Sequence, residues 1–314
     1  MKQLSIYHVK AIYMGKFNVM AVVVTSSENR ALEMVEWGFD GYTDIRIRNI
    51  GISTVINISS MVDSSETVTT ITFTDSTITY FDENGVTQSK IRQTELDFGV
   101  TYTPGRKTVG YGVERSVSNS GRYPTVYASY TKGVEGLVDS DFNYDKLQLY
   151  YRHRILMGGF GKLKYFLEAG KTFGNVPLTM LDVVPGNQTI FSVPRTFDLL
   201  NYYDFVTDEY AALHVEHNFN GRILSRIPLM RKLKWREVVS AKAVYGTFDQ
   251  KNLDELVLAD GMHNFERNKP FVEAALGIEN IFKVLRVDGL WRLSYLDNPN
   301  IIKFGIRAKF QIDF

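Results

Sequence analysis

The sequence has no cysteine among its 314 residues and only 8 prolines. The absence of cysteine excludes a disulfide framework, a cysteine zinc site and a thiol nucleophile. The sequence also has no excess of one charge, since it contains 36 basic and 35 acidic side chains. Nothing therefore indicates a nucleic-acid partner or an acidic tail. No run of about 18 apolar residues occurs, which excludes a transmembrane helix. This absence does not exclude a membrane β-barrel, because each of its strands needs only roughly ten alternating residues.

Aromatic residues are abundant, at 13% of the chain, which excludes intrinsic disorder. The longest apolar run in the first 16 residues is Ala11–Met14, which is too short for the apolar core of a secretory signal peptide. The octet Phe17–Val24 could form such a core, but it fits a buried strand at least as well. We therefore expect no signal peptide in this sequence.

Residues 1–58 predict a small β-β-α-β domain. Two apolar runs precede Ser26, which is a suitable helix N-cap, and apolar residues at helical spacing follow from Ala31 to Phe39. A strand is expected over residues 42–48. The Ser/Thr/Asp-rich segment 59–67 has no periodicity and predicts a linker. His8 is a lone histidine on an expected strand and indicates no chemistry.

From residue 68 onward apolar and polar residues alternate with period two in segments of eight to fourteen residues. Each segment predicts a long strand with one apolar and one polar face. In one of them, Val272, Ala274, Leu276 and Ile278 alternate with Glu273 and Glu279. We predict about ten antiparallel strands over residues 68–314, forming all or the C-terminal part of a transmembrane β-barrel.

The last segment alternates most regularly, with Phe304, Ile306, Ala308, Phe310, Ile312 and Phe314 on one face. A terminal aromatic residue preceded by apolar residues at alternate positions is the pattern by which barrel-assembly machinery takes up a last strand. We therefore expect Phe310, Ile312 and Phe314 to form an assembly signal. A soluble β-sandwich also alternates and is the competing fold.

The lengths of the connections favour the barrel. If Phe314 lies at the periplasmic rim, the turns at 157–159 and 280–284 fall on the periplasmic side, and the long insertions 174–207 and 247–269 fall outside, as in outer-membrane barrels. Two periplasmic connections, 104–122 and 220–234, are longer than this rule expects. Tyrosines and tryptophans near strand ends suit the membrane interfaces.

No catalytic, cofactor or metal site is predicted. On a strand, His214 and Glu216 share one face and His217 takes the other, so the two histidines cannot bind one metal ion. Asp204 and Asp208 are expected to be solvated loop charges. Ser240 with His214 is the one pair from which a lipase-like site could be assembled, and we expect no enzyme activity.

The densest basic run combines cations with Ile223, Leu224, Ile227, Leu229 and Leu233. It could hold an anionic lipid or a protein partner at the periplasmic rim, or it could be a turn tucked into the barrel. The cations of this candidate docking surface are Arg222, Arg226, Arg231, Lys232, Lys234 and Arg236.

Five segments together resemble a Bacteroidota outer-membrane family. They are Phe197–Ala211, His217–Gly221, Ile227–Val238, Gly277–Lys283 and Asp297–Asn300, followed by the terminal Phe314. Members of the family are barrels of unknown function that usually follow a carboxypeptidase-regulatory-like domain, and the likeness covers roughly residues 90–314. The resemblance implies an outer-membrane barrel distantly similar to the surface-antigen and barrel-insertase group, with no catalytic residues. The upstream domain, signal peptide and early strands of the family are missing from this sequence, so it could be a fragment or a fused reading frame.

The sequence thus predicts a non-catalytic protein of the Gram-negative outer membrane. We expect it to serve envelope biogenesis or transport through periplasmic-rim partners, with the lipid bilayer and the barrel-assembly machinery as further partners and no cofactor. A passive pore, a membrane anchor for a missing upstream domain, and a soluble β-sandwich binding module are the alternatives.

Overall fold

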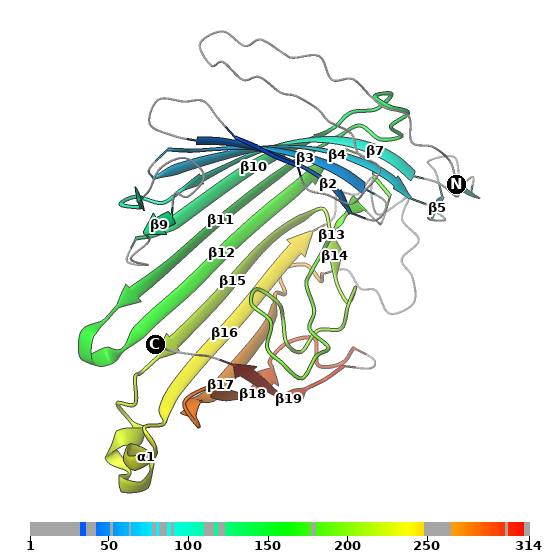
Figure 1. Ribbon diagram of the computed structural model, residues 1–314. Helices are drawn as coiled ribbons and strands as arrows, with labels where there is room; N and C mark the ends of the chain where they lie inside the picture. Colours follow the sequence, from blue (N-terminus) through cyan, green and yellow to red (C-terminus); the bar gives the residue numbers. More distant parts are fainter. Residues whose placement is uncertain are drawn as a thin grey trace. The chain divides into compact units, whose positions relative to one another are not determined.

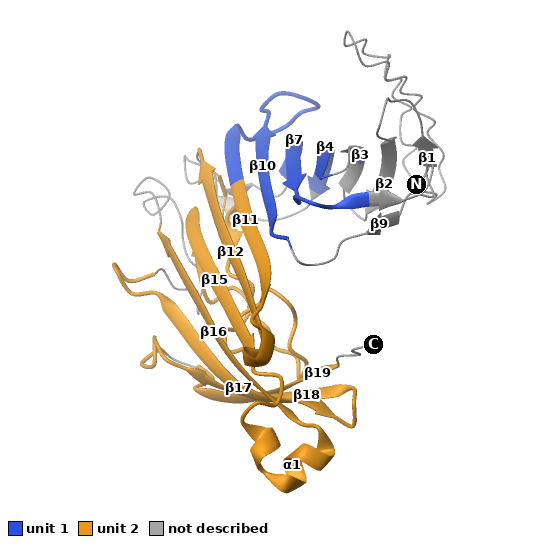
Figure 2. Cartoon of the chain, turned by 90° about the vertical axis from the view of Figure 1, so that its left-hand side faces the viewer, with its two compact units in different colours: residues 1–147 blue, residues 148–314 orange. Residues whose placement is uncertain are grey.

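The computed structural model describes most of the chain from residue 32 onward (Figure 1). The described residues are 32–35, 42–50, 53–62, 64–76, 80–81, 87–88, 91–109, 116–118, 123–174, 176–177, 180–247, 265–298 and 301–310. They belong to two compact units, residues 1–147 and 148–314, which Figure 2 colours separately. Among the described residues, no helix is long and apolar enough to cross a membrane.

The first unit contains antiparallel strands in the order β1-β2-β3-β4-β7-β10. These strands are β1 (Leu32–Val35), β2 (Tyr42–Ile50), β3 (Ser53–Val62), β4 (Ser65–Ser76), β7 (Ile91–Tyr102) and β10 (Thr125–Gly133). Two short pairings join β5 (Tyr80–Phe81) to β6 (Thr87–Gln88) and β8 (Lys107–Val109) to β9 (Ser116–Ser118). Thr recurs along β4, together with Val68 and Ile71, and such β-branched residues favour strands.

Two predictions for the N-terminal part are wrong within the described residues. The expected linker 59–67 is strand, since residues 59–62 end β3, residues 65–67 begin β4, and the two strands pair in register. The expected helix after Ser26 is replaced at Leu32–Val35 by β1, which pairs with β2. Pairing with a neighbouring strand overrides the local helical spacing there. The strand expected at 42–48 is confirmed as β2, and residues 1–31 lie outside the described residues.

The second unit contains the strands from β11 to β19, and β11 begins just before its boundary. The strand order is β11-β12-β15-β16-β17-β18-β19. The strands are β11 (Tyr144–Leu156), β12 (Lys162–Phe173), β15 (Glu209–Asn218), β16 (Arg236–Thr247), β17 (Phe271–Ile281), β18 (Leu285–Arg292) and β19 (Phe304–Phe310). The connections hold η2 (Gly158–Phe160), β13 (Asp182–Val183) paired with β14 (Val206–Thr207), η4 (Leu224–Arg226) and the helix α1 (Pro228–Leu233).

The predicted fold class is confirmed as mainly β with antiparallel pairing. In the described part of the chain, ten long strands follow residue 64, namely β4, β7, β10, β11, β12 and β15 to β19, against about ten expected from residue 68. The predicted alternation of faces is also confirmed. Along β17, the odd-numbered residues from Phe271 to Glu279 are buried, and Leu276 on the other face is 58% exposed.

Burial in the second unit is the reverse of that in a soluble sheet protein. Large apolar side chains on all seven long strands are exposed, including Leu149, Leu167, Leu213, Val239, Leu276, Trp291 and Ile306. The opposite face is buried although it is polar, and it carries Glu273, Glu279, Arg286, Asp288 and Arg292. Burying charges has a high cost unless they are paired, so the polar face must be covered and its charges matched.

The connections alternate between the two ends of these strands, as predicted. The η2 turn, the segment with η4 and α1, and the turn at 282–284 lie at one end, because β12, β15, β16, β17 and β18 pair antiparallel in sequence. The connection from β12 to β15 lies at the other end, and α1 is seen beyond the opposite ends of β15 and β16 in Figure 1. Residues 248–264 of the second long insertion lie outside the described residues.

Candidate functional site

Residues 182–207, which we call the docked loop, fold back against the polar face of β16 to β19. Its side chains Val184, Phe197, Leu200 and Phe205 are buried with Ala212, Val244, Phe271 and Tyr295 of the strands and of the connection after β18. Leu199 packs separately against Ala275 and Leu290. The insertion predicted to lie outside the barrel is therefore in part a cover for the polar face.

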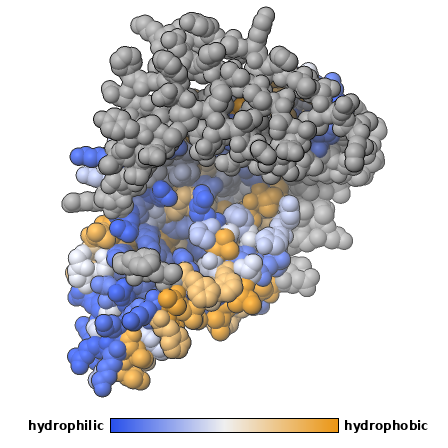
Figure 3. Space-filling model, in the orientation of Figure 1, coloured by the Kyte–Doolittle hydropathy of each residue, from blue (hydrophilic) through white to orange (hydrophobic). Residues whose placement is uncertain are grey.

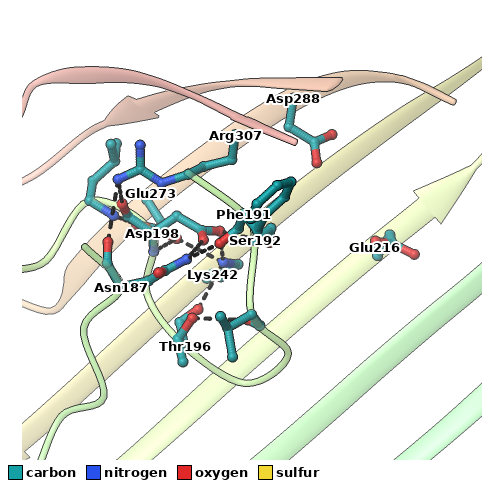
Figure 4. A network of polar contacts seen from close by, with 12 residues as sticks. Asn187, Phe191, Ser192, Thr196, Asp198, Glu216, Lys242, Glu273, Asp288 and Arg307 are labelled. Atoms are coloured by element: carbon teal, nitrogen blue, oxygen red, sulfur yellow. Dashed lines mark hydrogen bonds and ion pairs between the residues drawn. The ribbon is translucent and has the colours of Figure 1, made fainter. Parts of the chain in front are cut away.

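A buried ion-pair cluster, which we call the latch, joins the docked loop to the strands (Figure 4). Lys242 Nζ lies 3.1 Å from Glu273 Oε1, contacts the carboxylate of Asp198, and donates to the carbonyl of Thr196 at 2.8 Å. Lys242 and Glu273 are directly opposite in the β16–β17 register, which places both on the polar face. Asp198 and Glu273 are almost completely buried.

Glu273 also binds the backbone of the docked loop. Its Oε1 accepts from the N–H of Asp198 at 2.9 Å, and its Oε2 accepts from the N–H of Leu199 at 3.0 Å. Two backbone N–H donors and one ammonium group thus satisfy the carboxylate of Glu273, which is buried from solvent. Arg292, opposite Glu273 in the β17–β18 register, donates to the carbonyl of Leu199 at 3.3 Å.

The last strand adds a further hold on the docked loop. The guanidinium of Arg307 donates to the carbonyls of Asp198 at 2.8 Å and Asn187 at 3.3 Å. Asn187 Nδ2 in turn donates to Asp198 Oδ1 at 2.7 Å. Figure 4 shows Arg307, Asn187 and Asp198 turned toward one another. Four strands, β16 to β19, therefore fix one turn of the loop.

The docked loop also reaches the second edge of β19. Ser192 N donates to the carbonyl of Ala308 at 2.8 Å, and Ala308 N donates to the carbonyl of Ile190 at 3.0 Å, which makes a parallel bridge at Phe191. The rings of Phe191 and Phe310 lie 5.4 Å apart. Unpaired strand edges are sites of unwanted pairing, so this short segment protects part of the edge.

A second ion-pair cluster lies toward the other end of the polar face. Arg286 NH1 lies 2.6 Å from Glu216, and Arg286 Nε lies 2.8 Å from Asp288. Lys164 of β12 completes the cluster at 3.0 Å from Glu216. Opposite charges on the polar face are thus paired in this cluster.

A cavity of about 150 Å³ lies between the docked loop and strands β12, β15 and β16. Its polar lining includes Glu168, Asp182, Arg195, Tyr210 and His214. The hydroxyl of Tyr210 donates to Glu168 at 2.9 Å, and that of Thr172 donates to Asp182 at 3.3 Å. Both carboxylates therefore have protein donors.

The histidines lie as the strand alternation predicts. His214 packs against Phe197 of the docked loop, with 4.9 Å between ring centroids, and Glu216 is held in the second cluster. His217 hydrogen-bonds the carbonyl of Phe160 in the η2 turn at 2.8 Å. Among the described residues, no group of three or more His, Cys, Asp or Glu is placed to hold a metal ion.

The prediction that Asp204 and Asp208 are solvated loop charges is wrong, because both side chains are buried. Asp204 Oδ2 accepts from the N–H of Asn201 at 2.9 Å, which closes a turn at the tip of the docked loop. The dense apolar content of Phe197–Phe205 was the sequence signal that this loop would be buried.

The predicted basic surface forms the connection between β15 and β16. We call residues 222–236 the basic segment, and it includes η4 and α1. Arg222, Arg226, Arg231, Lys232 and Lys234 are exposed, and Arg236 on β16 lies 3.8 Å from Glu279. The segment stands beyond the strand ends and is not tucked against the polar face.

In the expected assembly signal, Phe310 is 66% exposed on β19, and Ile312 and Phe314 lie outside the described residues. The role of these residues stays a prediction. The same is true of docking at the basic cations.

The chain matches the model of a family of unknown function, the DUF5686 C-terminal domain, over residues 63–258, which is more than half of its length. It is similar in structure to BamA from Haemophilus ducreyi lacking POTRA domains 1–3, with 11% identity and a TM-score of 0.45. That match covers 85% of this chain and 64% of the BamA chain, so the chain spans less than two thirds of it. A weaker likeness, to Pseudomonas aeruginosa OccK11 (OpdR), has 8% identity and a TM-score of 0.26 and covers 85% of this chain and 86% of that one. None of the curated proteins matches the chain.

Proposed function

The chain belongs to the DUF5686 family of unknown function, and we propose that it is a non-catalytic outer-membrane β-barrel protein whose interior is closed by the docked loop. In this proposal it serves envelope biogenesis or transport through contacts at its periplasmic rim. A Bacteroidota source and a preceding regulatory-like domain are part of the same proposal.

One observation carries the membrane assignment, namely the exposed apolar face and buried polar face of the second unit. A bilayer favours apolar side chains on the outside, whereas a soluble β-sandwich would pack those faces into a dry core. Strand length agrees, because the 12 residues of β12 or β16, tilted at about 45°, span roughly 28 Å, close to the apolar thickness of a bilayer.

A closed interior follows from the same polar face. The latch and the second cluster pair buried charges of the polar face, and the docked loop packs against that face. In the described part of the second unit, paired charges and packed side chains occupy the polar face, which argues against a water column there. We therefore favour a function carried out by contacts at the periplasmic rim. The alternatives are a passive pore and a membrane anchor for an upstream domain.

Conductance of the purified full chain in planar bilayers tests this proposal. We expect the native protein to show no large steady conductance. A variant in which residues 186–200 are replaced by a short Gly/Ser linker should show channels, because it lacks the latch carboxylate of Asp198. Large steady conductance of the native protein would favour the passive pore.

The absence of catalysis is also a proposal. Ser240 lies opposite Glu216 and Ala275 in register, whereas His214 lies opposite Lys242, so the serine and the histidine are diagonal neighbours that are offset along the strands. The His214 ring packs against the rings of Phe166 and Phe197, with centroid distances of 6.0 and 4.9 Å, so aromatic side chains rather than Ser240 surround it. We expect purified protein to hydrolyse p-nitrophenyl esters no faster than buffer does. Hydrolysis that disappears in Ser240→Ala would contradict this expectation.

A further inference from the structure

We propose that the basic segment binds the phosphate head groups of anionic lipids at the periplasmic edge of the bilayer. This inference rests on the proposed membrane barrel and names the ligand of its rim surface. It is carried by the exposure, the charge and the anchoring of residues 222–236.

The apolar side chains of the basic segment are exposed. Ile223, Ile227, Leu229 and Leu233 all lie on the surface, and Leu229 is 60% exposed. In water these side chains would be an unfavourable surface, but at a bilayer edge they can enter the acyl boundary. Figure 3 shows hydrophobic and hydrophilic residues side by side at the lower end of the molecule, where Figure 1 places α1.

The cations of the segment differ from those on the strands. Lys164, Lys242 and Arg286 each have a carboxylate partner. Within the described residues, Arg226, Arg231, Lys232 and Lys234 have no acidic partner within 4.0 Å. Their positive charge is therefore available to an external anion.

The segment is held firmly at the strand ends. The carboxylate of Glu237 accepts from the N–H groups of Ile223 at 2.7 Å and Leu224 at 3.2 Å. The guanidinium of Arg222 stacks over the Phe160 ring at 4.0 Å, and Asn280 Nδ2 donates to the carbonyl of Lys234 at 2.7 Å. These contacts with the η2 turn and with the end of β17 fix the segment where the apolar outer face ends.

Its composition and position favour lipid over a protein partner. Long basic side chains next to apolar ones, just beyond an apolar band, lie at the level of the head groups. A stable protein interface buries about 800 Å² on each partner, which is more than a short segment with one six-residue helix can readily supply. Anionic phospholipid supplies both the phosphate and the acyl chain that this surface needs.

The test uses the absence of cysteine in the chain, which makes any introduced cysteine unique. Ser225→Cys, in exposed η4, places a fluorophore in the basic segment. Leu276→Cys places one on the apolar face of β17. The full chain is reconstituted in phosphatidylcholine vesicles that contain a small fraction of spin-labelled phosphatidylglycerol or spin-labelled phosphatidylcholine, with the quenching label near the top of the acyl chain.

We expect the fluorophore at residue 225 to be quenched several-fold more by the anionic lipid, and this preference should weaken with salt. Arg231→Ala with Lys232→Ala should bring the quenching by the two lipids close to equal, because each cation near the surface contributes about 1 kcal/mol, or about fivefold, to the attraction. Lys234 is left in place because its backbone is left-handed, with φ of 57°. Arg267→Ala with Lys303→Ala removes two exposed cations at the other strand ends and should change nothing.

Equal quenching by the two lipids, or an equal loss in the control variant, would overturn the inference. The fluorophore at residue 276, tested with a label deep in the acyl chain, separates the two proposals. If residue 276 is quenched and residue 225 shows no anionic preference, the membrane barrel stands and only the lipid site fails. If residue 276 is not quenched, both fail.

Discussion

Replacement of Lys242 by methionine is expected to lower the free energy of unfolding by about 3–5 kcal/mol, because it leaves the carboxylates of Asp198 and Glu273 buried without their cation. The docked loop should then leave the polar face. Urea unfolding in detergent micelles, followed by tryptophan fluorescence, measures the loss of stability. Faster cleavage by chymotrypsin at the exposed Tyr202 and Tyr203 reports the release of the loop.

Lys171→Met is the matched control for Lys242→Met. Lys171 also pairs with a carboxylate, Glu209, at 2.7 Å, but both side chains of this pair are about half exposed. Exposed ion pairs contribute roughly 0–1 kcal/mol, so this variant should unfold almost like the native protein. Equal stability losses in the two variants would show that burial of the latch does not matter.

The second large effect is expected from Gly161→Ala, which should destabilise the protein by about 3 kcal/mol. Gly161 follows the η2 turn with φ of 92° and ψ of −139°, a conformation open essentially to glycine. An added Cβ would lie 1.9 Å from the carbonyl oxygen of Asn218, so the backbone of β15 would have to move. The midpoint of urea unfolding in micelles measures the effect.

Gly159→Ala in the same turn provides the comparison. An added Cβ there meets nothing nearer than Arg222 NH1, at 3.8 Å. A change within about 0.5 kcal/mol is expected. A loss as large as that of Gly161→Ala would mean that the turn is sensitive to any side chain and not to the backbone conformation of Gly161.

The period of alternation was sufficient to predict the strands of the second unit and their faces, because an apolar residue at every second position can be satisfied on one face only. Leu276 and Glu273 were therefore assigned to opposite faces correctly. The same reasoning failed at residues 59–67, where Ser and Thr resemble a linker in composition but are β-branched or small enough to extend β3 and β4.

The latch could be predicted only in part. Alternation along each strand places Lys242 and Glu273 on the polar face. Their shared partner Asp198 lies in a loop with no periodicity, 44 residues before Lys242 in sequence. Loops have no register, so neither the docking of residues 182–207 nor the burial of Asp204 and Asp208 follows from alternation. The exposed state of the basic segment was one of two alternatives left open by its sequence.

The anchors of the docked loop also constrain the order in which the protein can fold. Its backbone is held by Glu273 from 75 residues downstream and by Arg307 from 109 and 120 residues downstream. Contacts between residues so far apart in sequence form slowly, because the long segment of chain between them must first close into a loop. The loop precedes β16 to β19 in sequence, so its complete set of hydrogen bonds can form only once Arg307 of β19 is in place. Closure of the interior is therefore coupled to the arrival of the last strand, and a chain truncated before β19 would keep its loop incompletely anchored.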